Sequence, residues 1–203
     1  MKQLLIFFLA FNISCNNKNI SEYTEESELK SGFFEIVQKW SQQPNGYARK
    51  IYVKIPDKKL EKYPVLIVLH GNGGDASKFV NKFNYINNHI IIAPQGYLKS
   101  WNIRKEKSKA PDIDFMAETI SYLKKMKNIE PENISIFGSS NGSALVNQLL
   151  IEFEDDSFKK AICRVSQLNS FQYRDNKFWA QSENNLFNTP SIPKQGRKIL
   201  CLA

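Results

Sequence analysis

Residues 138–142 spell G-S-S-N-G, a serine turn of the form G-x-S-x-G, and this turn constrains the fold more than any other feature. The run 133–137 before it is apolar and β-branched, which predicts a short buried strand. After it, leucine, alanine and valine recur at helical spacing over 144–151. Strand, tight turn and helix together project a serine hydroxyl above the edge of a sheet. Free N–H groups of the new helix then face any negative charge that develops there.

A second glycine-rich turn follows another buried-strand run. Residues 64–69 are continuously apolar and end directly in His70, Gly71, Asn72, Gly73 and Gly74. Alone, this segment would be an ordinary strand-to-helix turn with Asp75 as the helix cap. Together with the serine turn, it indicates backbone N–H groups that converge on one hydroxyl from two separate crossovers.

The chain between and before these turns alternates strands with helices. Residues 90–93 predict a further strand, and apolar positions over 113–126 predict a helix ahead of the serine turn. Such alternation favours an α/β fold with a mainly parallel sheet and helices on both faces. Upstream, 33–40 and 49–55 alternate around a Gln-Pro-Asn-Gly turn, which predicts an antiparallel hairpin at the leading edge of the sheet.

The chain resembles the secreted α/β-hydrolase esterases that are grouped with polyhydroxybutyrate depolymerases and feruloyl or acetylxylan esterases. The residues that carry the resemblance are 64–74, 93–96, Trp101 and 138–142. The resemblance covers most of the chain from about Gly32 onward. It implies a serine carboxylic-ester hydrolase that acts through an acyl-enzyme on polyesters or plant-polysaccharide esters, without a cofactor. It also implies site residues: Ser140 as the nucleophile, and an oxyanion hole built from the N–H of Asn141 and one from Asn72 or Gly73.

The base expected for Ser140 is missing from the sequence. In this fold the catalytic residues follow the order serine, acid, histidine, so the histidine should come after Ser140. The chain has two histidines, His70 and His89, and both come earlier. We interpret His70 as a brace for the oxyanion loop, and His89 as a structural residue at the opposite edge of the sheet. Asp175 is the best internal candidate for the acid.

The apolar run 198–202 predicts a further core strand. In the resembled family, the acid and the histidine follow the strand in this position. We therefore expect a C-terminally truncated or frameshifted copy of a longer esterase that is inactive or impaired, with its last strands and helix missing. One alternative is a non-catalytic pseudoenzyme that binds an ester or a carbohydrate, and another is a serine peptidase on the same fold. A peptidase would normally bring an additional domain, for which the chain has no room.

The polar segment 166–193 is long and carries several aromatic residues. Loops at the carboxyl ends of strands supply substrate contacts, so this segment is either a substrate lid or an insertion that its aromatics anchor to the body. Trp179 in this segment, and Trp101 near the end of its own strand unit, are the candidates for substrate binding.

Residues 1–15 combine Lys2, an apolar core and Cys15, the pattern of an export signal. The cysteine resembles the lipidated first residue of a bacterial lipoprotein, although ordinary signal cleavage is the alternative. Residues 16–31 are polar and predict a flexible tether, which leaves 32–203 as the hydrolase domain. We expect an exported protein in the cell envelope or the medium, whose membrane contact is limited to the lipid anchor.

Charge and cysteine content exclude other classes of partner. The net charge of +8 comes from scattered lysines and forms no basic stripe with interleaved aromatics, so nucleic-acid binding is not expected. No cluster of Cys, His and acidic residues has the spacing of a metal site. Cys163 and Cys201 are expected to lie on neighbouring core strands as buried thiols.

Overall fold

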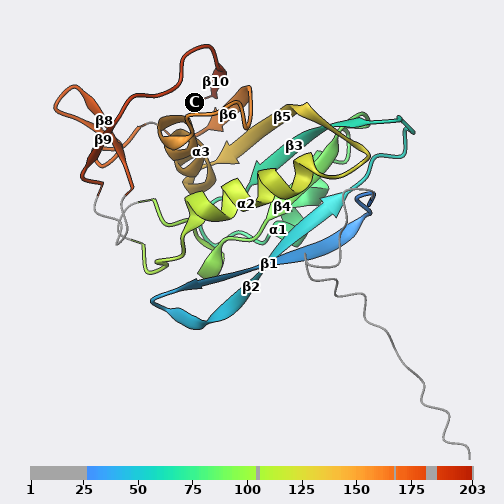
Figure 1. The fold of residues 1–203 in the computed structure, drawn as a ribbon, viewed down its shortest axis with the longest axis horizontal. Helices are drawn as coiled ribbons and strands as arrows, with labels where there is room; N and C mark the ends of the chain where they lie inside the picture. The colour runs from blue at the N-terminus through green and yellow to red at the C-terminus, as the bar shows by residue number, and fades with distance from the viewer. Residues whose placement is uncertain (1–26, 104–105, 167, 182–186, 203) are drawn as a thin grey trace, which may run out of the picture.

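The computed structural model describes residues 27–103, 106–166, 168–181 and 187–202. A seven-stranded sheet forms its centre, in the order β1-β2-β4-β3-β5-β6-β10 (Figure 1). Its strands are β1 (Gly32–Trp40), β2 (Gln43–Lys54), β3 (Tyr63–Leu69), β4 (Ile90–Pro94), β5 (Ile129–Ser139), β6 (Lys160–Arg164) and β10 (Lys198–Leu202). β1 and β2 pair antiparallel, as do β2 and β4, and all other neighbours pair parallel. The predicted mainly parallel sheet with an N-terminal antiparallel hairpin is confirmed.

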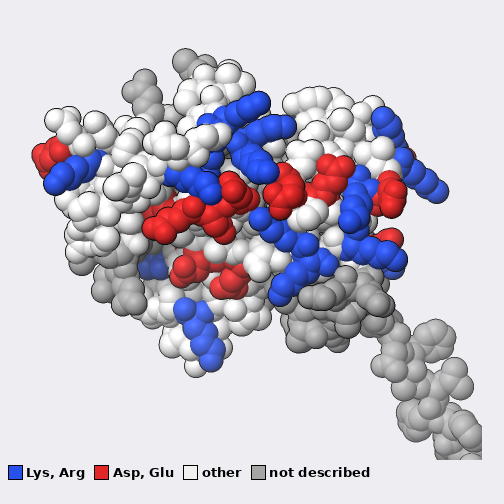
Figure 2. Space-filling view, turned by 45° about the horizontal axis from the view of Figure 1, so that its top comes forward, with Lys and Arg blue, Asp and Glu red and all other residues white. Residues whose placement is uncertain are grey.

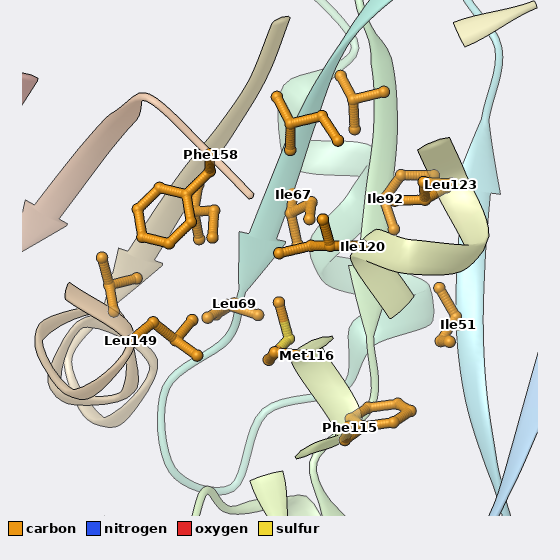
Figure 3. Close-up of a cluster of buried hydrophobic side chains, with 14 of the residues drawn as sticks. Ile51, Ile67, Leu69, Ile92, Phe115, Met116, Ile120, Leu123, Leu149 and Phe158 are labelled. Atoms are coloured by element: carbon orange, nitrogen blue, oxygen red, sulfur yellow. The ribbon is translucent and has the colours of Figure 1, made fainter. Parts of the chain in front are cut away.

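Helices cover both faces of this sheet. They are α1 (Ala76–Phe79), the 3₁₀ turns η2 (Val80–Phe83) and η3 (Tyr97–Lys99), α2 (Asp112–Lys124) and α3 (Asn141–Glu152). α2 and α3 pack on one face, where Met116 and Ile120 lie close to Ile67 and Leu69 of β3 (Figure 3). α1 and η2 cover the other face. Asp75 caps α1 as expected, because its carboxylate accepts from the backbone N–H of Ser77.

The central strand β3 shows why the sequence runs predicted this architecture. Val65, Ile67 and Leu69 point into the core cluster beneath α2 and α3. The alternate residues Leu66 and Val68 point into the smaller cluster beneath α1 and η2. A strand that is buried on both faces has no place for a polar side chain, so it reads as a continuous apolar run.

The turn of the β1–β2 hairpin differs from the prediction. The chain reverses at Ser41 and Gln42, and Trp40 is paired with Gln43. The Gln-Pro-Asn-Gly segment instead lies within β2. It is opposite the part of β1 between Gln38 and Trp40, where the pairing register shifts and β2 forms a bulge. Gly46 has a φ of +96°, a left-handed conformation that glycine adopts without a Cβ clash, so this glycine serves the bulge.

The domain begins earlier than Gly32, which corrects the predicted end of the tether. Leu29 is buried, and its N–H donates to Asn128 Oδ1 at 2.9 Å, while Asn128 Nδ2 donates back to its carbonyl at 3.0 Å. The carbonyl of Ser27 accepts a further bond from Lys127 N. The polar composition of this segment gave no sign that it packs on the domain, because the contact consists of two hydrogen bonds between the Leu29 backbone and the Asn128 side chain.

The predicted signal with Cys15 lies outside the described residues. Among the described residues, no helix is long and apolar enough to span a bilayer.

The segment predicted as a lid or insertion folds as a small antiparallel sheet. Its strands are β7 (Tyr173–Arg174), β8 (Lys177–Ala180) and β9 (Thr189–Ser191), paired in that order. It packs on α3, because Gln148 Nε2 donates to Trp179 O at 2.9 Å and Ser191 Oγ donates to Ile151 O at 2.7 Å. This sheet therefore stands beside the carboxyl edge of the main sheet (Figure 1).

β10 forms one edge of the main sheet and corrects the prediction for Cys201. Cys201 is the register partner of Cys163 on β6, as expected for neighbouring strands. Cys163 is buried, however, while Cys201 is exposed, as are all five residues of β10. Three aliphatic side chains on this strand are also about half exposed: Ile199, Leu200 and Leu202.

Candidate active site

The serine turn has the geometry of a nucleophile elbow. It joins β5 to α3, and Ser140 lies between them with φ 54° and ψ −120°, a strained conformation for a residue with a side chain. Two backbone bonds hold it there. Its N–H donates to Arg164 O at 2.9 Å, and its carbonyl accepts from Ala144 N at 3.0 Å. Ser140 is exposed, so its hydroxyl is open to a ligand above the sheet.

Close packing beneath the turn requires both flanking glycines. A Cβ on Gly138 would lie 2.4 Å from the carbonyl oxygen of Gly142. A Cβ on Gly142 would lie 2.4 Å from the carbonyl oxygen of Leu69 and 2.5 Å from that of His70. These neighbours are backbone atoms that cannot swing aside. Ser143, which stands where the resembled family often has another glycine, is fully buried in the turn.

The second glycine-rich turn lies directly against the elbow. A Cβ on Gly71 would be 3.3 Å from Ser140 Cβ and 3.9 Å from Ser140 Oγ. The next peptide N–H, that of Asn72, is therefore within about 8 Å of the hydroxyl. The two turns are therefore neighbours, and the convergence of their N–H groups on the Ser140 hydroxyl stays a prediction.

The Gly73 N–H is already committed, which corrects its prediction as an oxyanion donor. It donates to Lys99 O at 2.8 Å, because the left-handed Gly73 (φ +75°) turns its N–H toward the neighbouring loop. The Asn72 N–H makes no backbone bond within the described residues, and the Asn141 N–H opens α3, where first-turn N–H groups lack helical partners. Asn72 and Asn141 are therefore the available donors.

His70 is neutral and braces the glycine-rich turn, as predicted. Its Nε2 accepts from Gly96 N at 3.0 Å, so the proton sits on Nδ1, which lies 2.7 Å from Gly71 O and donates to it. Burial lowers the pKa of this imidazole, which favours the neutral form. Gln95 also holds the imidazole in place, since its side-chain Nε2 lies 3.0 Å from His70 Nε2. Both ring nitrogens are engaged, so His70 has no free atom to serve Ser140.

Trp101 is a structural residue, which corrects its prediction as a substrate contact. Its side chain is fully buried, and its Nε1 donates to His70 O at 2.8 Å. The Asn141 side chain clamps its backbone, because Asn141 Oδ1 accepts from Trp101 N at 2.7 Å and Nδ2 donates to Trp101 O at 3.2 Å. The indole therefore ties the glycine-rich turn to the elbow and exposes no face to a ligand.

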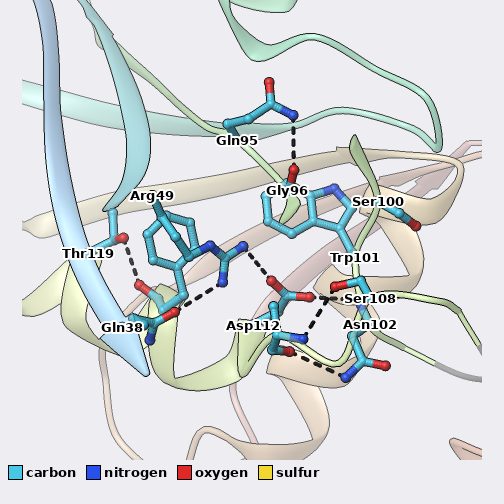
Figure 4. Close-up of polar contacts among 12 residues, drawn as sticks. Gln38, Arg49, Gln95, Gly96, Ser100, Trp101, Asn102, Ser108, Asp112 and Thr119 are labelled. Carbon is cyan, nitrogen blue, oxygen red and sulfur yellow. Dashed lines mark hydrogen bonds and ion pairs between the residues drawn. The ribbon is translucent and has the colours of Figure 1, made fainter. Parts of the chain in front are cut away.

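A buried ion pair supports the loop that carries Trp101 and Asn102. Arg49 Nη2 lies 2.5 Å from Asp112 Oδ1, and both side chains are completely buried (Figure 4). Asp112 Oδ2 also accepts from Asn102 N at 2.6 Å, and the Arg49 guanidinium lies 3.7 Å from the centre of the Phe115 ring. Burial lowers the pKa of Arg49 and raises that of Asp112, and each charge opposes the shift of the other.

Asp112 lies in the first turn of α2, and its pairing with Arg49 was not predicted from the sequence. A signal was available. Arg49 alternates with Ile51 and Val53, both buried, so the strand pattern already pointed its guanidinium inward. A buried arginine needs a carboxylate partner, and Asp112 directly precedes the apolar positions of α2.

The remaining predicted residues lie elsewhere. His89 is half-buried at the amino end of β4, with its Nδ1 2.8 Å from Asn88 Oδ1, as expected for a structural residue. Asp175 and Asn176 form the two-residue turn between β7 and β8 with φ of 52° and 58°, so Asp175 has a local conformational role. Trp179 is partly buried under the Arg174 guanidinium, 4.0 Å from its ring, and stays a prediction as a substrate contact.

Charge on the described surface is mixed. Figure 2 shows lysine and arginine side chains interspersed with aspartate and glutamate on the face in view. Among the described residues, no group of three or more His, Cys, Asp or Glu side chains is placed to hold a metal ion.

The sheet, its covering helices and the elbow together have the form of the α/β-hydrolase fold. No protein-family model and no curated protein sequence matches the chain. Solved structures do match it: a poly(aspartic acid) hydrolase of Sphingomonas sp. KT-1 (TM-score 0.52, 18% identity), a poly(3-hydroxybutyrate) depolymerase of Bordetella parapertussis (0.53, 15%) and a fluorophosphonate-binding serine hydrolase of Staphylococcus aureus (0.52, 16%). They align with 67%, 66% and 77% of this chain.

The matched region is a part of each neighbour. It spans 57%, 52% and 65% of the three solved chains, so this chain covers about half to two thirds of their length. At these identities the likeness establishes the fold and does not carry over an activity.

Proposed function

We propose that this protein is a serine carboxylic-ester hydrolase in which Ser140 attacks the ester carbonyl and forms an acyl-enzyme. The observation that carries the proposal is the strained backbone of Ser140 at an exposed strand-to-helix turn. A non-glycine residue at positive φ costs free energy, and such strain persists where the surrounding structure enforces it, often at functional sites. Here two tight glycine contacts and two backbone bonds enforce it.

The proposed oxyanion hole consists of the N–H groups of Asn141 and Asn72. When the serine oxygen adds to the carbonyl carbon, the carbonyl oxygen gains a full negative charge. Preorganised N–H donors stabilise that charge without reorganisation, and the positive end of α3 adds to the effect. The Asn141 side chain contributes indirectly, because its two bonds to Trp101 fix the elbow against the neighbouring loop.

The described residues do not provide a general base for Ser140. A serine hydroxyl has too high a pKa to attack an ester unaided and normally gives its proton to a histidine. Neither histidine of the chain is placed for this, because His70 is locked in its brace and His89 lies at the amino end of β4. We therefore propose that the 203-residue chain is an impaired catalyst, with roughly a thousandfold acceleration over water left from the oxyanion hole.

For the substrate, we propose esters carried by polyesters or plant polysaccharides. The neighbour named as a poly(3-hydroxybutyrate) depolymerase supports the polyester part of this class, since its fold matches the described domain. We further propose export of the chain through residues 1–15, with Cys15 either lipidated or removed with the signal. A non-catalytic ester- or carbohydrate-binding protein is the second candidate, and the engagement of both ring nitrogens of His70 favours it.

Chemical rescue with imidazole tests the proposal and separates it from the second candidate. If Ser140 and its oxyanion hole are in place and only the base is lacking, free imidazole can accept the serine proton. We expect hydrolysis of p-nitrophenyl acetate to rise with imidazole concentration by more than the background that imidazole itself produces. Mass spectrometry should find the acetyl group on Ser140.

The Ser140→Ala protein at the same concentration is the matched control, because it keeps the fold and the imidazole background. Equal rates for the two proteins at every imidazole concentration would refute a nucleophilic role. Such a result, combined with retained binding of an ester or glycan, would establish the non-catalytic binder instead.

A further inference from the structure

Three aromatic rings gather at the tip of the β1–β2 hairpin. Trp40 and Tyr97 have ring centres 4.9 Å apart, Tyr47 and Tyr97 5.1 Å, and Trp40 and Tyr47 6.0 Å. All three pairs are edge-to-face, with interplanar angles of 76° to 84°. Tyr47 is 41% exposed and the other two are half-buried. We call Trp40, Tyr47 and Tyr97 the aromatic tip.

The topology places the aromatic tip at the edge of the sheet where Ser140 lies. β1 is antiparallel to β2 and β2 is antiparallel to β4, so β1 runs in the direction of the parallel strands and ends at their carboxyl edge. β2 pairs with β4 over Ile51–Lys54, and the last strand residue of β4, Pro94, is opposite Ile51. The hairpin beyond this point therefore projects past the carboxyl edge (Figure 1).

A strained loop connects the aromatic tip to the nucleophile. Tyr97 is followed by Leu98 and Lys99, whose φ values of 53° and 59° are left-handed and unfavourable for residues with side chains. The carbonyl of Lys99 accepts the Gly73 N–H at 2.8 Å, and Gly71 in the same turn packs against Ser140. One loop therefore fixes both the Tyr97 ring and the turn beside the serine.

The polar groups around the rings suit a ligand that carries many hydroxyls. Gln43 Nε2 donates to the Tyr97 hydroxyl at 2.8 Å, so that hydroxyl keeps its own hydrogen for another acceptor. Trp40 Nε1 donates to Gln42 Oε1 at 3.2 Å at the exposed rim of the tip. Tyrosine and tryptophan side chains combine a rigid aromatic ring with a polar group that can form hydrogen bonds. This combination binds amphipathic rings at low entropic cost.

We propose that the aromatic tip is a carbohydrate-binding surface, on which pyranose rings of a linear glycan stack. The faces of a pyranose present C–H groups with partial positive charge, which match the negative face of an aromatic ring, and their equatorial hydroxyls reach the polar rim. A flexible aliphatic polyester has no comparable rigid face. The binding is independent of Ser140, and only its use in holding a polysaccharide near the serine rests on the proposed ester hydrolysis.

Titration of the ¹⁵N-labelled full chain with xylohexaose tests the surface. The chain has three tryptophans, and Trp101 is fully buried. We expect the indole N–H resonance of Trp40 to move as xylohexaose is added, while that of Trp101 stays in place. The Ser140→Ala protein should give the same titration, so a failure of ester chemistry and a failure of glycan binding are distinguishable.

Matched tyrosine variants locate the binding. Tyr47→Ala removes one exposed ring of the tip and should weaken xylohexaose binding roughly tenfold in Kd. Tyr85→Ala removes a 78% exposed tyrosine outside the tip and should leave the Kd unchanged. Circular dichroism checks that both variants remain folded. An unmoved Trp40 resonance in the unmodified protein would overturn the proposal, and so would equal losses in the two variants or a response only to a 3-hydroxybutyrate oligomer.

Discussion

Removal of the Asp112 carboxylate should severely destabilise the domain. Asp112→Ala leaves the Arg49 guanidinium fully buried without its partner, a change that costs about 3–5 kcal/mol in other proteins. It also removes the acceptor of the Asn102 N–H, and a buried unpaired donor costs about 1–3 kcal/mol. The two costs overlap, so we expect a loss of at least about 3 kcal/mol. Domains are stable by roughly 5–15 kcal/mol, which places the variant near its unfolding threshold.

A double variant separates this explanation from simple loss of packing. Arg49→Met with Asp112→Leu replaces the ion pair by apolar groups, and such replacements are often neutral or stabilising. Urea unfolding followed by circular dichroism should therefore find the double variant more stable than Asp112→Ala. The exposed pair of Lys159 and Glu132, 3.3 Å apart, provides the control, since Lys159→Ala should change stability by less than about 1 kcal/mol. A cost below about 1 kcal/mol for Asp112→Ala would refute the reasoning.

Four further outcomes are expected. Gly142→Ala should lower the free energy of unfolding by about 1–3 kcal/mol, because its Cβ would meet two backbone carbonyls; an unchanged urea midpoint would contradict this. The pKa of His70 is lowered in the folded state, so below pH 6.5 the unfolded chain binds a proton that the folded chain does not bind. Stability should therefore fall as pH drops below 6.5, and it should fall less steeply in the His70→Gln variant. Burial raises the pKa of Cys163 to about 11 from 9.0, so the thiol makes stability decline between pH 9 and 11, and Cys163→Ala should make that decline less steep. In peptide mapping at pH 8, iodoacetamide should modify the exposed Cys201 far faster than the buried Cys163.

The sequence predicted those parts of the fold that have strong periodicity or a special turn. The runs in β3, β4 and β5 and the spacing in α2 and α3 are long enough to show their period, and the elbow at Ser140 has its own signature. The sheet of β7, β8 and β9 was not predicted, because its strands are two to four residues long and too short to show alternation.

Side-chain roles within the site were harder to predict than the backbone. Trp101 looked like a substrate contact, yet its partners Asn141 and His70 are 40 and 31 residues away in the chain. Burial that depends on such distant contacts leaves no local pattern. The Gly73 N–H likewise finds its acceptor at Lys99, which belongs to a different loop, so only the folded arrangement of the two loops distinguishes it from the Asn72 N–H.

The half-exposed aliphatic side chains of β10 have a practical consequence for work with this protein. No described strand pairs with the outer side of this strand, and its side chains Ile199, Leu200 and Leu202 are apolar. An apolar border without a described partner strand is a template for pairing between molecules, and we expect it to promote aggregation of the 203-residue chain in concentrated solutions. A lysine in place of Leu200 would add a charge that opposes such stacking, and it would make concentrated samples easier to keep in solution.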